Sequence, residues 1–281
     1  LRLPFFSHQA TNQTMKKILS IHSSVVVGFV GNSVVAPVLS TLGHAPLMIN
    51  TVTLPAHPGY GLAGGGATSP DDITAFLGAL ETLGAYREIE IVISGYMGSL
   101  AQLVIIGEAI EKWQSIQPEG CYIFDPVLGD NDTLYIDAGL ADAMVDHLLP
   151  LAQIITPNQF ELGYLAGQPV QNKDDAVASA QILLARNTNL QAVVATGIDD
   201  QDQNGDLLVQ RIAEPHFAPA LDTGKNVSGG GDLLTSLLAG HIANGAEIPA
   251  AFIAASQKTQ RVLAASPSSR ELALRENLAL L

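Results

Sequence analysis

Short β-branched runs alternate with helical patterns along most of the chain, and no other sequence feature limits the fold as strongly. The runs predicted to be strands buried on both faces are 17–22, 47–52, 90–94, 120–124, 153–156 and 191–196. Helical patterns lie between them at 31–43, 71–84, 100–117, 138–149, 158–167 and 173–187. Pro37 interrupts the first of these patterns. Strand and helix in alternation predict a mostly parallel sheet with helices on both faces, which is a three-layer α/β fold.

Polar, small and acidic residues follow the predicted strands. In open parallel sheets the ligand binds beyond the carboxyl ends of the strands, so these segments are candidates for a binding site. They are Ser23, TLPAHPGYG (53–61), GYMGS (95–99), DPVLGD (125–130), TPNQFE (156–161) and TGIDD (196–200). We expect them to meet at one edge of the sheet.

The segment VSGGGDLLTSLLAG (227–240) places three glycines and Asp232 in front of a predicted helix. Leu233, Leu234, Leu237 and Leu238 share one helix face. The free N–H groups of such a helix start can bind an anion, and glycines allow the anion to come close. Asp232 is then either a helix cap or a reactive group beside the anion, and the spacing alone favours the cap.

Composition excludes several classes of function. The net charge of −14 and the pI of about 4.7 leave no basic surface for a nucleic-acid backbone. A phosphorylated ligand would have to be held by backbone amides, helix ends and a metal ion. No apolar run approaches ~18 residues, so no membrane span is expected. A single cysteine, Cys121, excludes an intrachain disulfide and is typical of the cytoplasm, and its place in a predicted strand indicates a core residue.

The first fourteen residues lack the pattern of a secretion signal and are expected to be a disordered extension ahead of Met15. No repeat or long linker divides the remainder. We therefore treat 15–281 as one domain.

Acidic and amide side chains lie where a metal ion would be needed for phosphate chemistry. Asp125 and Asp130 flank DPVLGD, and Asn158 precedes Glu161 in PNQFE. Asn158 can simply cap the helix that follows, or these residues can arrange a hydrated Mg²⁺. Together with the glycine loop they meet the needs of phosphoryl transfer, which favours the reactive role of Asp232 over the helix cap. Asp232 would then accept a substrate hydroxyl proton while the amides of Gly229, Gly230 and Gly231 face the phosphoryl group. No GxxxxGK[ST] nucleotide loop occurs.

These motifs resemble those of a known family. GGGD before an apolar helix is similar to the GTGD signature of ribokinase-like small-molecule kinases, and PNQFE resembles their Asn-x-x-Glu motif. More narrowly, the resemblance is to pyridoxal kinases, in order from Lys17 to Gly245. Its segments are ILSIHSSVVVGFVGNS, NTVTLPAHPGYG, SGYMGS, FDPVLGD and ITPNQFEL.

The resemblance implies roles for individual residues. Asp232 is expected to be the base for the 5′-hydroxymethyl group of pyridoxal, with the preceding glycines as the anion hole. Substrate contacts are expected from Ser23, His57, Pro58, Gly59 and Tyr96. The ATP and Mg²⁺ side is expected to include Asp125, Asp130, Thr156, Asn158, Glu161 and Thr196, with Asp125 and Glu161 on the metal and the threonines near the nucleotide or K⁺. The segment 199–208 is expected to cover part of the nucleotide, and the family's members are usually homodimers.

The sequence also departs from the family pattern. Gly230 replaces a threonine; Thr53, Pro55 and Pro58 stand in place of polar side chains; Ser24 replaces a histidine. These changes leave the preferred vitamer open.

Simpler interpretations remain for several residues. His57 and Lys225 can be loop residues, Tyr96 and Trp113 core residues, Asp130 a turn residue, and His22 a structural strand end.

Phosphorylation of B6 vitamers is the first hypothesis for function. A hydroxymethylpyrimidine kinase and a non-catalytic vitamer-binding protein are the alternatives.

Overall fold

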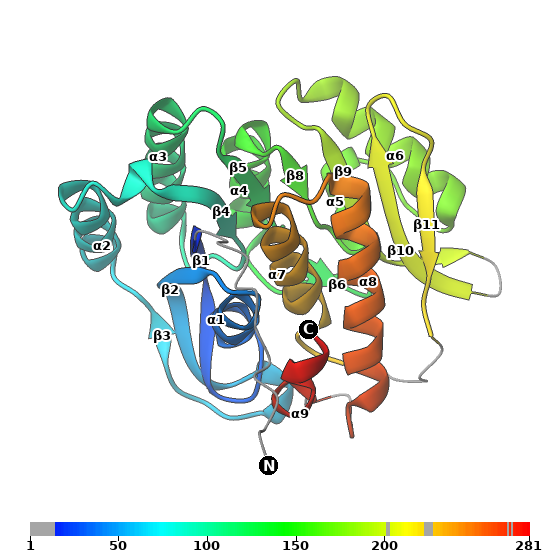
Figure 1. The fold of residues 1–281 in the computed structure, drawn as a ribbon, viewed down its shortest axis with the longest axis horizontal. Coiled ribbons are helices and arrows are strands. Elements are labelled where there is room, and N and C mark those ends of the chain that lie inside the picture. The colour runs from blue at the N-terminus through cyan, green and yellow to red at the C-terminus, as the bar shows by residue number, and fades with distance from the viewer. Residues whose placement is uncertain (1–14, 201–202, 222–226, 269, 271) are drawn as a thin grey trace, which may run out of the picture.

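A nine-stranded sheet forms the centre of the computed structural model, which describes residues 15–200, 203–221, 227–268, 270 and 272–281 (Figure 1). The strand order is β11-β10-β9-β8-β5-β4-β1-β2-β3. The strands are β1 (Lys17–Val27), β2 (Ala45–Ala56), β3 (Gly66–Ala67), β4 (Ile89–Ser94), β5 (Cys121–Phe124), β8 (Ile154–Ile155), β9 (Ala192–Asp200), β10 (Gln203–Gln210) and β11 (His216–Pro219). Neighbours from β2 to β9 pair in parallel, whereas β3, β10 and β11 are antiparallel to their neighbours.

Helices cover both faces of this sheet. The α-helices are α1 (Asn32–Thr41), α2 (Pro70–Thr82), α3 (Leu100–Ile116), α4 (Ala138–His147), α5 (Gln159–Ala166), α6 (Lys173–Arg186), α7 (Gly230–Ala243), α8 (Ile248–Ala265) and α9 (Leu274–Asn277). The 3₁₀ turns are η1 (Pro58–Tyr60), η2 (Ala85–Arg87), η3 (Leu149–Leu151) and η4 (Leu278–Leu280). One buried cluster joins the sheet to α2–α6, and the other joins it to α1, α7, α8 and α9. Figure 1 shows α1, α7 and α8 together on the near face.

The predicted three-layer α/β fold is confirmed, and every predicted strand and helix is present with shifted ends. Helix α1 runs through Pro37 although proline removes a backbone donor. Val34, Val35 and Val38 of this helix are fully buried, and their packing stabilises it despite the lost hydrogen bond. Trp113 is a core residue as expected, and its indole N–H donates to the carbonyl of Ile89 at 3.1 Å.

Several elements were not predicted from the sequence. These are helix α8, which packs beside α7, and the antiparallel strands β10 and β11 at one edge of the sheet. Of the segment 199–208, residues 199–200 and 203–208 lie in the β9–β10 pair. A two-stranded hairpin, β6 (Gly129–Asp130) with β7 (Thr133–Leu134), turns through Asn131 and Asp132, whose φ angles are 48° and 59°. The expected disordered extension 1–14, Lys225 and residues 201–202 lie outside the described residues.

The strand order reverses at β1, because β2 lies on one side of it and β4 on the other. Ligand sites of open α/β sheets lie at such a switch point, beyond the carboxyl ends of the strands. In this chain His22 lies in the middle of β1, directly after the last residue of β1 that pairs with β4, while Gly95 follows β4 and Asp125 follows β5. Among the described residues no helix is long and apolar enough to cross a membrane.

Candidate active site

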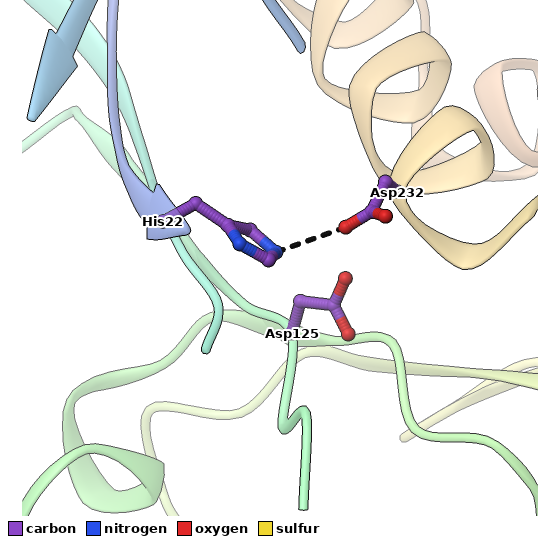
Figure 2. Close-up of side chains that lie close together, drawn as sticks. All are labelled: His22, Asp125 and Asp232. Carbon is purple, nitrogen blue, oxygen red and sulfur yellow. Dashed lines mark ion pairs between the residues drawn. The ribbon is translucent and has the colours of Figure 1, made fainter. Parts of the chain in front are cut away.

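Asp232 lies in the first turn of α7, and its carboxylate faces the end of the sheet. The helix N-cap is Gly229, which has φ 90° and provides no side-chain cap. Asp232 is therefore not the cap that its spacing alone favoured. Its Oδ1 lies 3.0 Å from Nε2 of His22, and only 12% of its side chain is exposed. Figure 2 shows His22, Asp125 and Asp232 converging from β1, the segment after β5 and α7.

Burial and nearby charges shift the pKa values of Asp232 and Asp125 in opposite directions. Burial acts to raise the pKa of Asp232, but the charge and contact of His22, the backbone N–H of Gly31 and the charge of His57 bring it below its ordinary value. The pKa of Asp125 is raised well above its usual range by burial and by the charge of Asp232. Asp232 is thus the ionised carboxylate at neutral pH, as a general base requires.

Two threonines complete the polar end of this cluster. Oγ1 of Thr235, one turn further along α7, donates to Oδ2 of Asp125 at 3.3 Å and also lies 2.9 Å from Oγ1 of Thr156. Thr156 is 3% exposed, so this pair is enclosed between α7 and the end of β8. Asp125 is therefore held from the α7 side as well as from the sheet.

The glycines before Asp232 have different roles in the backbone. A Cβ on Gly229 would lie 2.2 Å from the carbonyl oxygen of Phe29, so only glycine fits there. A Cβ on Gly231 would meet no atom within 4 Å. The N–H of Gly230 already donates to the carbonyl of Val227 at 3.3 Å, so its predicted place among the free donors is not borne out. The first N–H groups of a helix have no partner within the helix, and on the open side at Gly231 they can be offered to an anion.

The residues predicted to contact substrate lie around the same space. Oγ of Ser23 lies 3.3 Å from Nδ1 of His22. His57 is the N-cap of η1, and its Nδ1 accepts the N–H of Gly59 at 3.2 Å. It lies close enough to Asp232 to interact with it electrostatically, and burial lowers the pKa of its imidazole. Tyr96 follows Gly95 and is half-buried, which raises the pKa of its phenol. Their contacts with a ligand stay predictions.

Asn158 and Glu161 form a capping box at the start of α5. Oδ1 of Asn158 accepts the N–H of Glu161 at 2.9 Å, and Oε2 of Glu161 accepts the N–H of Asn158 at 2.8 Å. Oε1 of Glu161 accepts the N–H groups of Leu128 and Gly129 at 3.0 and 3.4 Å. Burial raises the pKa of Glu161 to about 8, against the lowering effect of these backbone donors. Both carboxylate oxygens of Glu161 thus accept hydrogen bonds from backbone N–H groups. Its predicted contact with a metal ion stays a prediction.

The remaining predicted ATP-side residues lie close to this capping box. Thr196 pairs with Asn158 through an isolated bridge, and its N–H donates to the carbonyl of Pro157 at 2.9 Å. Asp130 lies in β6, where its Oδ1 accepts the N–H of Asn131 at 2.8 Å. Nδ2 of Asn158 donates to the carbonyl of Gly129 at 2.8 Å, which joins α5 to the same hairpin.

His22 was not predicted from the sequence to be part of the site. His22, Asp125 and Asp232 bring ligand-type atoms within 4.8 Å of one another. The alternation of side chains along a strand was a signal that could have found it. His22 lies on the same face of β1 as Ile18, which belongs to the buried cluster that includes α7.

Comparison with known proteins identifies the family. The phosphomethylpyrimidine kinase family model matches residues 79–273. A Bordetella avium pyridoxine/pyridoxal/pyridoxamine kinase is 36% identical over 88% of this chain and 84% of its own length. The chain belongs to the pyridoxal kinase family. The ribokinase-like fold named from its motifs is therefore confirmed.

Solved structures of similar proteins agree with the fold. The crystal structure of the Entamoeba histolytica pyridoxal kinase matches with a TM-score of 0.88 and 25% identity over 94% of both chains. A Bacteroides thetaiotaomicron protein named as a phosphomethylpyrimidine kinase and crystallised with pyridoxal matches with a TM-score of 0.83 and 25% identity over 95% of both chains. The match to family members therefore extends over nearly the whole chain.

Removing the carboxylate of Glu161 tests its structural role. Glu161→Ala should lower the free energy of unfolding by about 2 kcal/mol, because buried backbone donors lose their acceptor. Urea unfolding without ATP or Mg²⁺ measures this, with the exposed Glu111→Ala as the control. Equal stability of the two variants would contradict the structural role.

Proposed function

We propose that the chain transfers the γ-phosphoryl group of ATP to the 5′-hydroxymethyl group of pyridoxal, and to that of pyridoxine and pyridoxamine. The observation that carries this proposal is the ionised Asp232 beside the open helix start of Gly231. Similarity to the Bordetella avium kinase, whose name lists the three vitamers, supports the substrate class. The Bacteroides thetaiotaomicron structure with pyridoxal supports it further.

In the proposed mechanism, Asp232 orients the substrate hydroxyl and accepts its proton as the oxygen attacks the γ-phosphorus, while the bond from that phosphorus to the β–γ bridging oxygen breaks and ADP leaves. The free N–H groups in the first turn of α7, at Gly231, face the transferring phosphoryl group and stabilise its developing charge. Ser23, His57, Pro58, Gly59 and Tyr96 border the ring of the substrate. These residues orient the alcohol so that attack occurs from one direction.

Mg²⁺ is proposed on the Asp125 side of the site, where it would neutralise phosphate charge. The buried Asp125 carboxylate, close to a second carboxylate, fits an oxygen ligand for a divalent cation. Glu161 and Asn158 would support this side through the backbone that they hold, and Asp130, Thr156 and Thr196 would lie toward ATP or K⁺. The cytoplasm is the proposed location and a homodimer the proposed assembly.

A second candidate is a kinase of hydroxymethylpyrimidine, which the matching phosphomethylpyrimidine kinase family model favours. Both substrates carry a hydroxymethyl group on a nitrogen heterocycle, so the same base and anion site serve either one. The two substrates differ in their rings, so the segment 53–61 on the substrate side is expected to decide which one binds. Thr53 and Pro58 of this segment are exposed and can contact a ligand.

An assay of four alcohols tests the proposal. Pyridoxal, pyridoxine, pyridoxamine and hydroxymethylpyrimidine are each incubated with ATP and Mg²⁺, and the phosphorylated product is measured by mass spectrometry. We expect pyridoxal to give the highest kcat/KM and EDTA to abolish the product. Exclusive turnover of hydroxymethylpyrimidine would favour the second candidate, and vitamer binding without product would indicate a non-catalytic binding protein.

A further inference from the structure

His22 is fixed at an irregular point of β1. The register of β1 with β2 shifts between His22 and Ser24, which interrupts the regular alternation of the strand before pairing resumes at Ser24. Nδ2 of Asn32, the first residue of α1, donates to the carbonyl of His22 at 3.3 Å. The same buried amide accepts from Ser20 at 2.7 Å and donates to Oδ1 of Asn50 at 2.8 Å. These hydrogen bonds therefore fix the backbone of β1 at His22.

Two glycines leave room for the imidazole ring. A Cβ on Gly95 would lie 2.0 Å from both Cδ2 and Nε2 of His22, and a Cβ on Gly31 would lie 2.9 Å from its Nδ1. The ring is 3% exposed. It thus occupies a space bounded by the residue after β4 and the residue before α1, with little freedom to turn.

The hydrogen bond at Nδ1 determines whether the other ring nitrogen, Nε2, which lies next to Asp232, carries a proton. Nδ1 accepts the N–H of Ser23 at 2.8 Å, so the neutral ring carries its proton on Nε2. The imidazolium also carries a proton there. In both protonation states Nε2 therefore carries a proton. It lies 3.0 Å from Oδ1 of Asp232, as an ion pair whose N–H is not aligned as a hydrogen bond.

Asp232 requires such a partner because Asp125 lies beside it. Both carboxylates are buried, and each would repel the other when ionised. The ion pair with His22 uses Oδ1 of Asp232 and leaves Oδ2 for a substrate hydroxyl. Without His22, the backbone N–H of Gly31 is the remaining contact named here for this carboxylate, and we expect it to hold the orientation of Asp232 toward the alcohol less firmly.

We propose that His22 is a positioning residue that holds the carboxylate of Asp232 in the orientation needed to accept the substrate proton. This role rests on the proposed phosphoryl transfer to a B6 vitamer. His22 does not itself contact the substrate in this account. It acts through Asp232, so its loss affects turnover more than nucleotide binding.

Two substitutions separate the donor from the shape of the ring. His22→Phe keeps a ring without a donor, and we expect kcat to fall about 30-fold with the KM for ATP within about two-fold of wild type. His22→Gln keeps an N–H donor, and we expect kcat within about five-fold of wild type. Pyridoxal phosphorylation and thermal unfolding are measured for both variants.

His44→Phe is the matched control. His44 is also buried and also contacts α7, but its Nε2 lies 2.9 Å from the carbonyl of Gly240 near the other end of the helix. We expect this variant to lower the Tm while kcat stays within about two-fold of wild type. Equal losses of kcat in His44→Phe and His22→Phe would overturn the proposal, as would a His22→Gln variant as slow as His22→Phe.

Wild-type results separate the two proposals. If wild type phosphorylates pyridoxal and His22→Phe is equally active, only the role of His22 is overturned. If wild type phosphorylates no vitamer, the proposed function is overturned and this role with it.

An NMR measurement tests the geometry without turnover. In ¹⁵N-histidine-labelled wild type at neutral pH, we expect Nε2 of His22 to be protonated, in the neutral ring or in the imidazolium, and its resonance to shift in Asp232→Asn. A neutral ring protonated on Nδ1, or a resonance that does not respond to that substitution, would overturn the proposal.

Discussion

Asp232→Asn is expected to lower kcat for pyridoxal phosphorylation by about two orders of magnitude or more, because an amide cannot accept the substrate proton. The substitution keeps the size of the side chain and its place in the first turn of α7. ATP binding should therefore remain within about two-fold of wild type, since the nucleotide side of the site is unchanged. Steady-state kinetics and calorimetric titration with an ATP analogue measure the two effects separately.

The exposed Asp146, on α4, provides the control for this substitution. Asp146→Asn removes a carboxylate from the surface and should leave kcat unchanged. Near-normal turnover in Asp232→Asn would refute the assignment of the base. Loss of ATP binding together with turnover would instead indicate that Asp232 organises the nucleotide side.

Gly229→Ala is expected to have the largest effect on stability. Its φ of 90° disfavours any residue with a Cβ, and the added atom would lie 2.2 Å from the carbonyl oxygen of Phe29. Because backbone must move to relieve this contact, we expect a loss of about 3 kcal/mol in the free energy of unfolding. The start of α7 moves with it, so kcat should also fall at least about ten-fold.

Gly231→Ala is the matched control for stability within the same three glycines. A Cβ there meets no atom within 4 Å, and alanine favours a helix over glycine by about 1 kcal/mol. Urea unfolding should therefore show Gly231→Ala to be as stable as wild type or more stable. If both variants lose the same stability, the close contact with Phe29 does not explain the need for Gly229.

The fold could be predicted from the sequence because its signals are local. The runs at 90–94 and 120–124 are apolar enough to be buried on both faces, and they form β4 and β5. The strands β10 and β11 were missed because their antiparallel pairing depends on contacts with β9 rather than on a pattern of their own. Helix α1 continues through Pro37 because tertiary packing outweighs a local preference.

The site was predictable in part for the same reason. A glycine loop before an apolar helix placed Asp232 at a helix start, and PNQFE carried the signature of a capping box. The bond from Glu161 to Leu128 joins residues 33 positions apart, and no local pattern predicts it. His22 was interpreted as a structural strand end because its importance arises from α7, whose first turn lies 210 positions further along the chain.

The most direct test of the account is a crystal structure of the chain with pyridoxal and a non-hydrolysable ATP analogue. We predict that the 5′-hydroxyl oxygen lies about 2.6–3.2 Å from Oδ2 of Asp232, on the side away from His22, and faces the γ-phosphorus beside the start of α7. A hydroxyl bound out of reach of Asp232, or phosphates bound away from that helix start, would contradict the account.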